Sequence, residues 1–211
     1  MRSVVAVLII AAFLSGCAST GDWSSDAPGK TSSKASKAAR VNLKSQSVSK
    51  VYAPSDNLWI RIRDGFQMEP MNSPLEVEQV RWLSARPDYV NRSMTRSSRY
   101  LFYIVQEVNA RNMPTEIALL PFVESAFVTN AKSSAKAVGL WQFMPATGKT
   151  FGLKQDWWVD NRRDVTAATN AALDYLQKLH TMFGTWDLAL AAYNAGEGTV
   201  QHAIDRNRRK G

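Results

Sequence analysis

The sequence contains a single cysteine, Cys17, and only two histidines, His180 and His202. One cysteine cannot form an intramolecular disulfide or a cysteine-based zinc site, and two separate histidines on expected helices are a poor basis for metal catalysis. The sequence also lacks a recognisable phosphate-cradling glycine-rich loop and a Ser-His-Asp arrangement. It therefore indicates neither a cofactor nor a resident metal.

The part of the chain that is expected to fold carries almost no net charge. The formal net charge is +8, but residues 18–50 hold six basic against two acidic residues, and residues 206–211 add four basic ones. Residues 51–205 hold fifteen basic against sixteen acidic residues. A nucleic-acid-binding domain would carry a basic stripe on its folded part, so no nucleic-acid partner is expected. The basic ends are interpreted as solvated segments or as segments near an anionic surface.

The chain begins with MRSVVAVLIIAAFLSGCAST, in which a basic residue precedes an apolar stretch and then small residues. This pattern is typical of a secretory signal, and the apolar stretch of residues 4–14 is too short for a membrane span. The segment LSGC resembles a bacterial lipobox, which implies cleavage before Cys17 and a lipid on its thiol. In the lipoproteins that it resembles, Ala18 favours the outer membrane, so the mature chain would be anchored there and face the periplasm. An ordinary cleaved signal with an incidental cysteine is the alternative.

Residues 18–50 are rich in serine, alanine, lysine and glycine and have few large apolar side chains. Such a segment buries too little apolar surface to offset the entropy lost on folding. We therefore expect a lipoprotein signal peptide over residues 1–16 and a lipidated, mostly flexible tether over residues 17–70.

From residue 71 onward, apolar residues recur at helical spacing and strand signals are few. Val77, Val80 and Leu83 form one such series, and Asn112 is a plausible stop after a second series over residues 101–108. Further helices are expected within residues 114–124, 139–151, 165–183 and 185–195. These helices predict an all-α domain over residues 71–211, large enough for one hydrophobic core.

The stretch ALLPFVESAF places a carboxylate in an otherwise apolar run. In a helix that opens at residue 114, Ile117, Leu120, Pro121 and Glu124 fall on one face. A carboxylate on a core-facing stripe costs free energy unless it is hydrogen-bonded, paired or protonated. Glu124 is therefore either a buried structural glutamate with a polar partner or a functional acid with a raised pKa.

Three motifs resemble one family. PFVESAF, SSAKAVGLWQFMPATGKTFGL and ALAAYNAGEGTV occur in this order, and the similarity covers about residues 80–208. Together they resemble the lytic transglycosylases with a goose-type lysozyme-like domain, the SLT domain. The resemblance implies a lysozyme-like helical fold and peptidoglycan glycan strands as the substrate. It also implies non-hydrolytic cleavage of the β-1,4 bond between N-acetylmuramic acid and N-acetylglucosamine, which leaves a 1,6-anhydro end.

The resemblance assigns expected roles by position. Glu124 would protonate the leaving oxygen and then accept the proton of the muramoyl 6-hydroxyl, so one acid/base is sufficient. Ser133 would form a hydrogen bond near this carboxylate and the substrate, although it can equally be a turn hydroxyl. The other matching positions are two groove residues, Gln142 and Met144, a tyrosine facing the catalytic glutamate, Tyr193, and an adjoining polar residue, Asn194. Trp141 is expected in the core, and Gly139 is expected to permit a close backbone approach.

Some features depart from the family pattern and leave alternatives open. Lys136 stands where many relatives have a small residue, and the family domain usually continues beyond this chain, so the domain over residues 71–211 is expected to be truncated at its C-terminal end. A hydrolytic muramidase of the same fold would need a second carboxylate to activate water. A truncated, non-catalytic peptidoglycan-binding lipoprotein is the other alternative. The acidic residues available for a hydrolase are Asp156, Asp160, Asp164 and Glu197.

Overall fold

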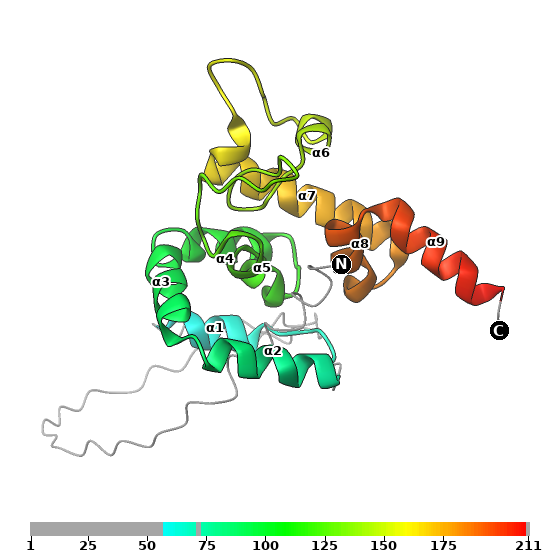
Figure 1. The fold of residues 1–211 in the computed structure, drawn as a ribbon, viewed down its shortest axis with the longest axis horizontal. Helices are drawn as coiled ribbons and strands as arrows, with labels where there is room; N and C mark the ends of the chain where they lie inside the picture. The colour runs from blue at the N-terminus through cyan, green and yellow to red at the C-terminus, as the bar shows by residue number, and fades with distance from the viewer. Residues whose placement is uncertain (1–56, 71–72, 210–211) are drawn as a thin grey trace, which may run out of the picture.

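The computed structural model describes residues 57–70 and 73–209, and these residues are almost entirely helices and loops (Figure 1). Within these ranges the only β-pairing is three isolated bridges, which confirms the predicted all-α class. The α-helices are α1 (Leu58–Asp64), α2 (Pro74–Ser84), α3 (Pro87–Ser97), α4 (Leu101–Ala110), α5 (Leu120–Ser125), α6 (Pro145–Thr150), α7 (Val165–Phe183), α8 (Trp186–Ala195) and α9 (Glu197–Arg208). Two 3₁₀ helices, η3 (Thr115–Leu119) and η4 (Asn161–Arg163), precede α5 and α7.

Polar caps fix the ends of the helices that the sequence predicts best. The Asp164 side chain accepts a hydrogen bond from the Ala167 backbone amide at the start of α7. Gly184, with φ +80°, ends α7 in a left-handed conformation, and Thr185 then caps α8. Because a cap satisfies backbone groups that the helix leaves unpaired, these residues define where one helix stops and the next begins.

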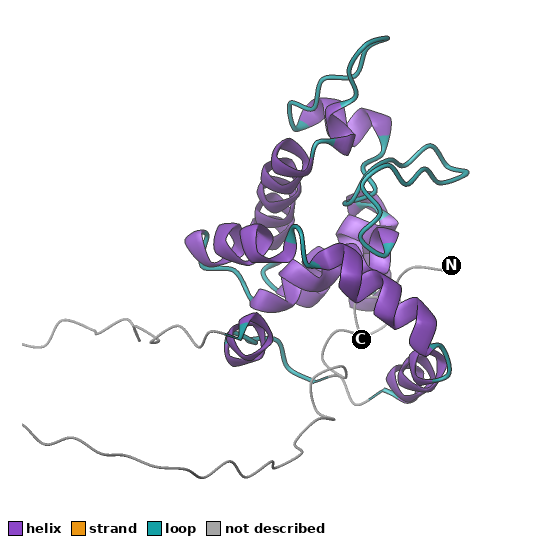
Figure 2. Cartoon of the chain, turned by 90° about the vertical axis from the view of Figure 1, so that its left-hand side faces the viewer, coloured by secondary structure: helices purple, strands orange, loops and turns teal. Residues whose placement is uncertain are grey.

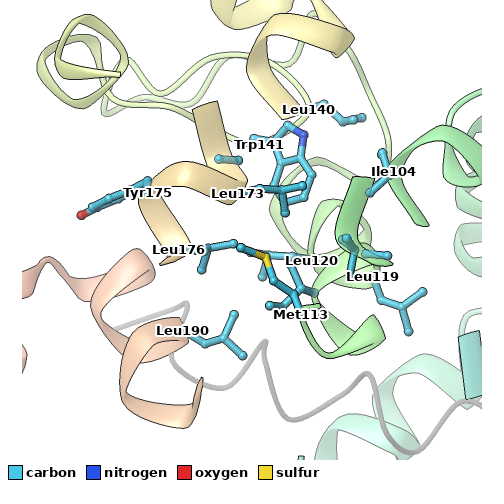
Figure 3. Packing of buried hydrophobic residues seen from close by; sticks show 14 of the residues in the cluster. Ile104, Met113, Leu119, Leu120, Leu140, Trp141, Leu173, Tyr175, Leu176 and Leu190 are labelled. Carbon is cyan, nitrogen blue, oxygen red and sulfur yellow. The ribbon is translucent and has the colours of Figure 1, made fainter. Parts of the chain in front are cut away.

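Helix α7 lies at the centre of the hydrophobic core. Leu173, Leu176 and Leu179 of this helix are fully buried. Figure 3 shows Leu173 and Leu176 beside Leu120 of α5 and Met113 of the loop before η3. Burial of such side chains is the main favourable contribution to folding. The core therefore joins the helix that carries Glu124 to the longest helix of the protein.

The folded part begins earlier than residue 71. Ile62 of α1 is fully buried, and its carbonyl oxygen accepts a hydrogen bond from the Thr115 hydroxyl. The Glu116 carboxylate accepts hydrogen bonds of 2.9 Å from the backbone amides of Gln67 and Met68. These contacts hold residues 57–70 on η3, so a tether that extends to residue 70 is wrong for this segment. The rest of the expected tether, Cys17 and the signal peptide lie outside the described residues.

The helix expected over residues 139–151 forms only in its second half, as α6. Antiparallel bridges join Val138 to both Lys132 and Phe143, so residues 138–143 make a tight turn instead. Gly139 in this turn has φ +88° and Gln142 has φ +49°, and neither value is compatible with a right-handed helix.

The described residues contain no helix long and apolar enough to span a bilayer.

Candidate active site

Glu124 lies in the last turn of α5, just before two residues with an unusual backbone conformation. The two residues that follow α5, Ala126 and Phe127, have φ values of +50° and +59°. Left-handed conformations are unfavourable for residues with a side chain, and such strain concentrates at functional sites. Burial of Phe127 against Phe122, with ring centroids 4.5 Å apart, helps to hold this turn. The chain therefore turns away sharply just after the candidate acid.

The Glu124 carboxyl lies in an environment that favours its neutral form. Desolvation by burial raises its pKa from 4.5 to about 7, and hydrogen bonding with the Asn194 side chain of α8 offsets part of this rise. An apolar environment destabilises the charged form of a carboxyl group more than the neutral form. Glu124 can therefore carry a proton near neutral pH, as a general acid must.

Tyr193 of α8 belongs to the same site. Its hydroxyl donates a hydrogen bond of 2.8 Å to the Trp141 carbonyl oxygen, and its ring lies 5.5 Å from the Tyr175 ring, measured between centroids. Desolvation by burial and the nearby Glu124 carboxyl raise the pKa of Tyr193 well above its ordinary value. The Tyr193 hydroxyl therefore stays protonated and neutral beside Glu124. The structure thus brings together Glu124, Tyr193 and Asn194 from two different helices.

The turn over residues 138–143 is attached to both of these helices. Next to Glu124, the Ser125 hydroxyl donates a hydrogen bond of 2.8 Å to the Leu140 carbonyl oxygen. The Trp141 side chain is fully buried, and its indole N–H donates to the Thr169 hydroxyl of α7. This burial agrees with the expectation that Trp141 is a core residue. The turn is therefore a fixed wall between α5 and α8.

The two residues predicted to line a groove lie in this turn and directly after it. The Gln142 side chain donates a hydrogen bond of 2.8 Å from Nε2 to the Gly139 carbonyl oxygen, and its left-handed backbone is held within the turn. Two residues on, the Met144 side chain is 44% exposed. Met144 therefore offers an exposed apolar side chain at the end of the turn, where α6 begins.

Ser133 makes a different contact from the one expected by resemblance. Its hydroxyl oxygen accepts a hydrogen bond of 3.0 Å from the Ala137 backbone amide, and its own amide donates to the Ala137 carbonyl oxygen. Ser133 is thus a turn hydroxyl in this structure. The bridge pairs Lys132–Val138 and Val138–Phe143 place this turn directly beside the wall that carries Gln142.

One residue that supports the wall, Arg162, was not identified from the sequence. Arg162 of η4 is buried, and its Nη1 donates to the carbonyl oxygens of Lys136 and Phe143 at 3.1 Å and 3.2 Å. Its Nε and Nη2 bind both oxygens of Asp160 at 2.9 Å and 2.8 Å. Gly139 packs so closely on Arg162 that an added Cβ would lie 1.8 Å from the Arg162 carbonyl oxygen. The close approach expected of Gly139 is therefore to the protein's own backbone.

The four acidic residues considered for a hydrolytic mechanism all have structural roles. Asp156 binds the Trp158 and Val159 amides, and Asp160 binds Arg162. Asp164 caps α7, and Glu197 forms an ion pair of 3.1 Å with a lysine of α7. Within the described residues, neither these side chains nor any other carboxylate contributes to the raised pKa of Glu124.

The two histidines lie on different helices, α7 and α9. His180 stacks on Trp186, with ring centroids 4.1 Å apart, and His202 is exposed on α9. The part of the chain that the structure describes contains no cluster of three or more His, Cys, Asp or Glu residues suited to a metal ion.

A family model described as the transglycosylase SLT domain matches residues 102–211. The chain belongs to this family. The match begins in α4 and includes Glu124, the wall over residues 138–143 and Tyr193, so the residues that meet in the candidate site all lie within the family domain.

Two similar proteins carry names that bear on function. The chain is 39% identical over 210 residues to membrane-bound lytic murein transglycosylase D of Escherichia coli (strain K12), a match that covers 98% of this chain and 46% of that protein. It is 42% identical over 81 residues to the peptidoglycan transglycosylase gp16 of Escherichia phage T7, which covers 37% of this chain and 6% of that protein. The chain thus spans about half the length of the first relative.

Proposed function

We propose that this protein is a lytic transglycosylase that cleaves the β-1,4 bond between N-acetylmuramic acid and N-acetylglucosamine in peptidoglycan. The observation that carries the proposal is Glu124, a carboxyl group with a pKa of about 7 that faces Tyr193 and Asn194. Membership of the SLT domain family supports it. The names of the two relatives, a murein transglycosylase and a peptidoglycan transglycosylase, support the choice of substrate.

In the first step, protonated Glu124 donates its proton to the glycosidic oxygen as the bond from that oxygen to the muramoyl anomeric carbon breaks. The positive charge that develops on the sugar is stabilised by the carboxylate that has just formed. In the second step, this carboxylate accepts the proton of the muramoyl 6-hydroxyl while the hydroxyl oxygen attacks the anomeric carbon. The product has a 1,6-anhydro ring, and Glu124 is protonated again.

Within residues 57–70 and 73–209, no second carboxylate contributes to the raised pKa of Glu124, and this favours the route over hydrolysis. An inverting glycosidase needs a separate base for water, and a retaining one needs a carboxylate nucleophile about 5 Å from the acid. In the described residues, the acidic side chains proposed for that role are each engaged elsewhere, as caps or ion pairs. An internal hydroxyl nucleophile requires only one acid/base group, the role proposed for Glu124.

The proposal is tested with the Glu124→Gln variant. Glutamine keeps the size of the side chain but cannot donate or accept the proton, so we expect release of soluble fragments from purified peptidoglycan to fall by at least about a thousandfold. Glu197→Gln, on the surface of α9, is the matched control and should retain activity. Substantial cleavage by folded, cooperatively melting Glu124→Gln would refute the role of Glu124. Retained peptidoglycan binding without cleavage by the wild-type chain would instead support a non-catalytic binding protein.

For localisation, we infer that Cys17 receives a lipid and anchors the protein to the outer membrane, facing the periplasm. The LSGC sequence supports this inference, and the name of the E. coli relative, which calls it membrane-bound, is consistent with it. Cys17→Ser should abolish incorporation of labelled palmitate and release the protein from the membrane fraction. Membrane retention of Cys17→Ser would contradict lipid anchoring at this residue.

A further inference from the structure

Trp157 and Trp158 are almost fully in solvent. Their side chains are 89% and 87% exposed, whereas Trp141 is fully buried. Both lie in the loop between α6 and η4, which extends away from the helices in the views of Figure 1 and Figure 2. Adjacent aromatic side chains exposed to this degree are unusual on a soluble surface, and they commonly mark a binding site.

The exposure is not the result of an unstructured loop. One Asp156 oxygen accepts hydrogen bonds of 2.8 Å from the Trp158 and Val159 backbone amides, and the Asp156 amide donates to the Val159 carbonyl oxygen at 2.9 Å. Lys154 forms an ion pair of 3.0 Å with Asp156. The Asn161 amide, on the other side of the loop, donates to the Lys154 carbonyl oxygen. The fold thus builds a defined tip and places two tryptophans on it.

The base of this loop is fixed to the segment that carries Met144. The Gln155 side chain donates from Nε2 to the Pro145 carbonyl oxygen at 2.9 Å, and Pro145 directly follows Met144. Gly148 of α6 leaves room for this contact, because a Cβ there would lie 2.9 Å from the Gln155 Nε2. The tryptophan tip and the exposed Met144 are therefore held on one framework, to which Arg162 also binds through the Phe143 carbonyl oxygen.

The chemistry of the tip suits a sugar ring better than an anionic surface. Within residues 154–160 the one basic side chain, Lys154, is neutralised by Asp156, and Asp160 is paired with Arg162. Binding to an anionic membrane gains from unpaired Lys and Arg next to the apolar anchor, and this tip offers none in residues 154–160. A flat indole face instead packs against the C–H face of a pyranose, a contact that needs no charge.

We propose that Trp157 and Trp158 form an accessory glycan-binding site that stacks on sugars of the peptidoglycan strand away from the bond that Glu124 cleaves. The inference rests on the proposed function, because it takes the same polymer as the ligand. A polymer held at a second point stays near the catalytic site after each cleavage, which raises its effective concentration there.

The test measures binding without cleavage. The full-length chain carrying Glu124→Gln is incubated with purified, lipid-free peptidoglycan sacculi, and the bound fraction is measured by co-sedimentation. Adding Trp157→Ala and Trp158→Ala should weaken binding about tenfold, which corresponds to about 1.4 kcal/mol. Phe102→Ala, which removes a 51% exposed aromatic side chain from α4, is the matched control and should leave binding unchanged.

Unchanged sacculus binding by the double tryptophan variant would overturn the proposal. The proposal would also be overturned if the double tryptophan variant lost binding to phosphatidylglycerol vesicles but still bound sacculi. The tip would then be a membrane contact. A second measurement needs no tryptophan variant: soluble glycan strands should protect the Glu124→Gln chain from fluorescence quenching by acrylamide, and lack of protection would also contradict the site. Failure of the wild-type chain to cleave peptidoglycan would refute the proposed function, and the binding comparison between the Glu124→Gln chains with and without the two tryptophans would still test this site separately.

Discussion

The Tyr193 hydroxyl donates a hydrogen bond of 2.8 Å to the Trp141 carbonyl oxygen, so helix α8 holds the turn that forms the wall of the candidate site. On the other side, the Ser125 hydroxyl donates to the Leu140 carbonyl oxygen, so α5 holds the preceding residue of the same turn. Two successive carbonyl groups are thus bound by the two helices that also supply Glu124 and Asn194. The position of the wall and the position of the acid depend on each other.

Tyr193→Phe should weaken this attachment. The change removes the hydroxyl and leaves the Trp141 carbonyl oxygen without its donor, so we expect a loss of about 1 kcal/mol in the free energy of unfolding. Cleavage should fall mainly through kcat, because the wall shifts relative to Glu124. Urea unfolding and fragment release from peptidoglycan are the measurements. Tyr89→Phe, on α3, is the control, and equal effects of the two variants would contradict the role given to Tyr193.

Arg162→Met should destabilise the wall more strongly. Methionine keeps much of the buried side-chain volume but leaves Asp160 without its partner and frees the carbonyl oxygens of Lys136 and Phe143. Loss of one partner of a largely buried ion pair costs about 3 kcal/mol. Arg163→Met, at the exposed neighbouring position, should cost far less. Unfolding of both variants at the same urea concentration would contradict the role given to Arg162.

Gly139→Ala separates steric exclusion from backbone strain. Gly139 has φ +88°, and its added Cβ would lie 1.8 Å from the Arg162 carbonyl oxygen, so the turn cannot form without moving backbone. Gly152→Ala is the matched control, because Gly152 has φ +76° and nothing within 4 Å of the added Cβ. The control should lose about 1 kcal/mol of stability from strain alone. Gly139→Ala should lose several times more, by thermal unfolding, and a similar loss in both variants would contradict the tight packing.

The raised pKa of Glu124 predicts a pH dependence of stability. The folded chain holds a proton on Glu124 up to about pH 7, whereas the unfolded chain releases it near 4.5. Between these values the folded state binds more protons, so stability falls as the pH rises through this window. Glu124→Gln cannot titrate, so its stability relative to the wild type should rise between pH 4.5 and 8 by up to about 3 kcal/mol. Urea unfolding at both pH values tests this, with Glu78→Gln as control, and a difference that does not change with pH would contradict the raised pKa.

Helices with their own caps were predictable from the sequence. The expected helix over residues 165–183 matches α7, and the one over residues 185–195 matches α8 to within one residue. Local signals, namely apolar spacing, Asp164 and Gly184, determine these ends. The predicted helix over residues 139–151 was wrong in its first half, because the turn there is imposed by contacts with Arg162 that are distant in sequence. Residues 57–70 were assigned to the tether, since the burial of the short helix α1 depends on contacts with η3, which is distant in sequence.

Only some residues of the candidate site could be predicted, because local sequence signals mark some of them and contacts distant in sequence position the others. Glu124 stood out because a carboxylate on an apolar stripe is anomalous, and its neighbours Tyr193 and Asn194 were found only through resemblance to a family. Ser125 and Arg162 were missed, since their hydrogen bonds reach carbonyl oxygens fifteen or more positions away and no local pattern marks them. The turn role of Ser133 was one of two readings that the sequence left open.

The most direct test of the central claim is mass spectrometry of the fragments that the wild-type chain releases from purified peptidoglycan in water enriched in heavy oxygen. Intramolecular attack by the 6-hydroxyl consumes no water. We therefore predict fragments with 1,6-anhydro ends that are one water lighter than the hydrolysis products and carry no heavy oxygen. Reducing ends that contain heavy oxygen would show that water is the nucleophile and would contradict the assignment of Glu124 as the sole acid and base.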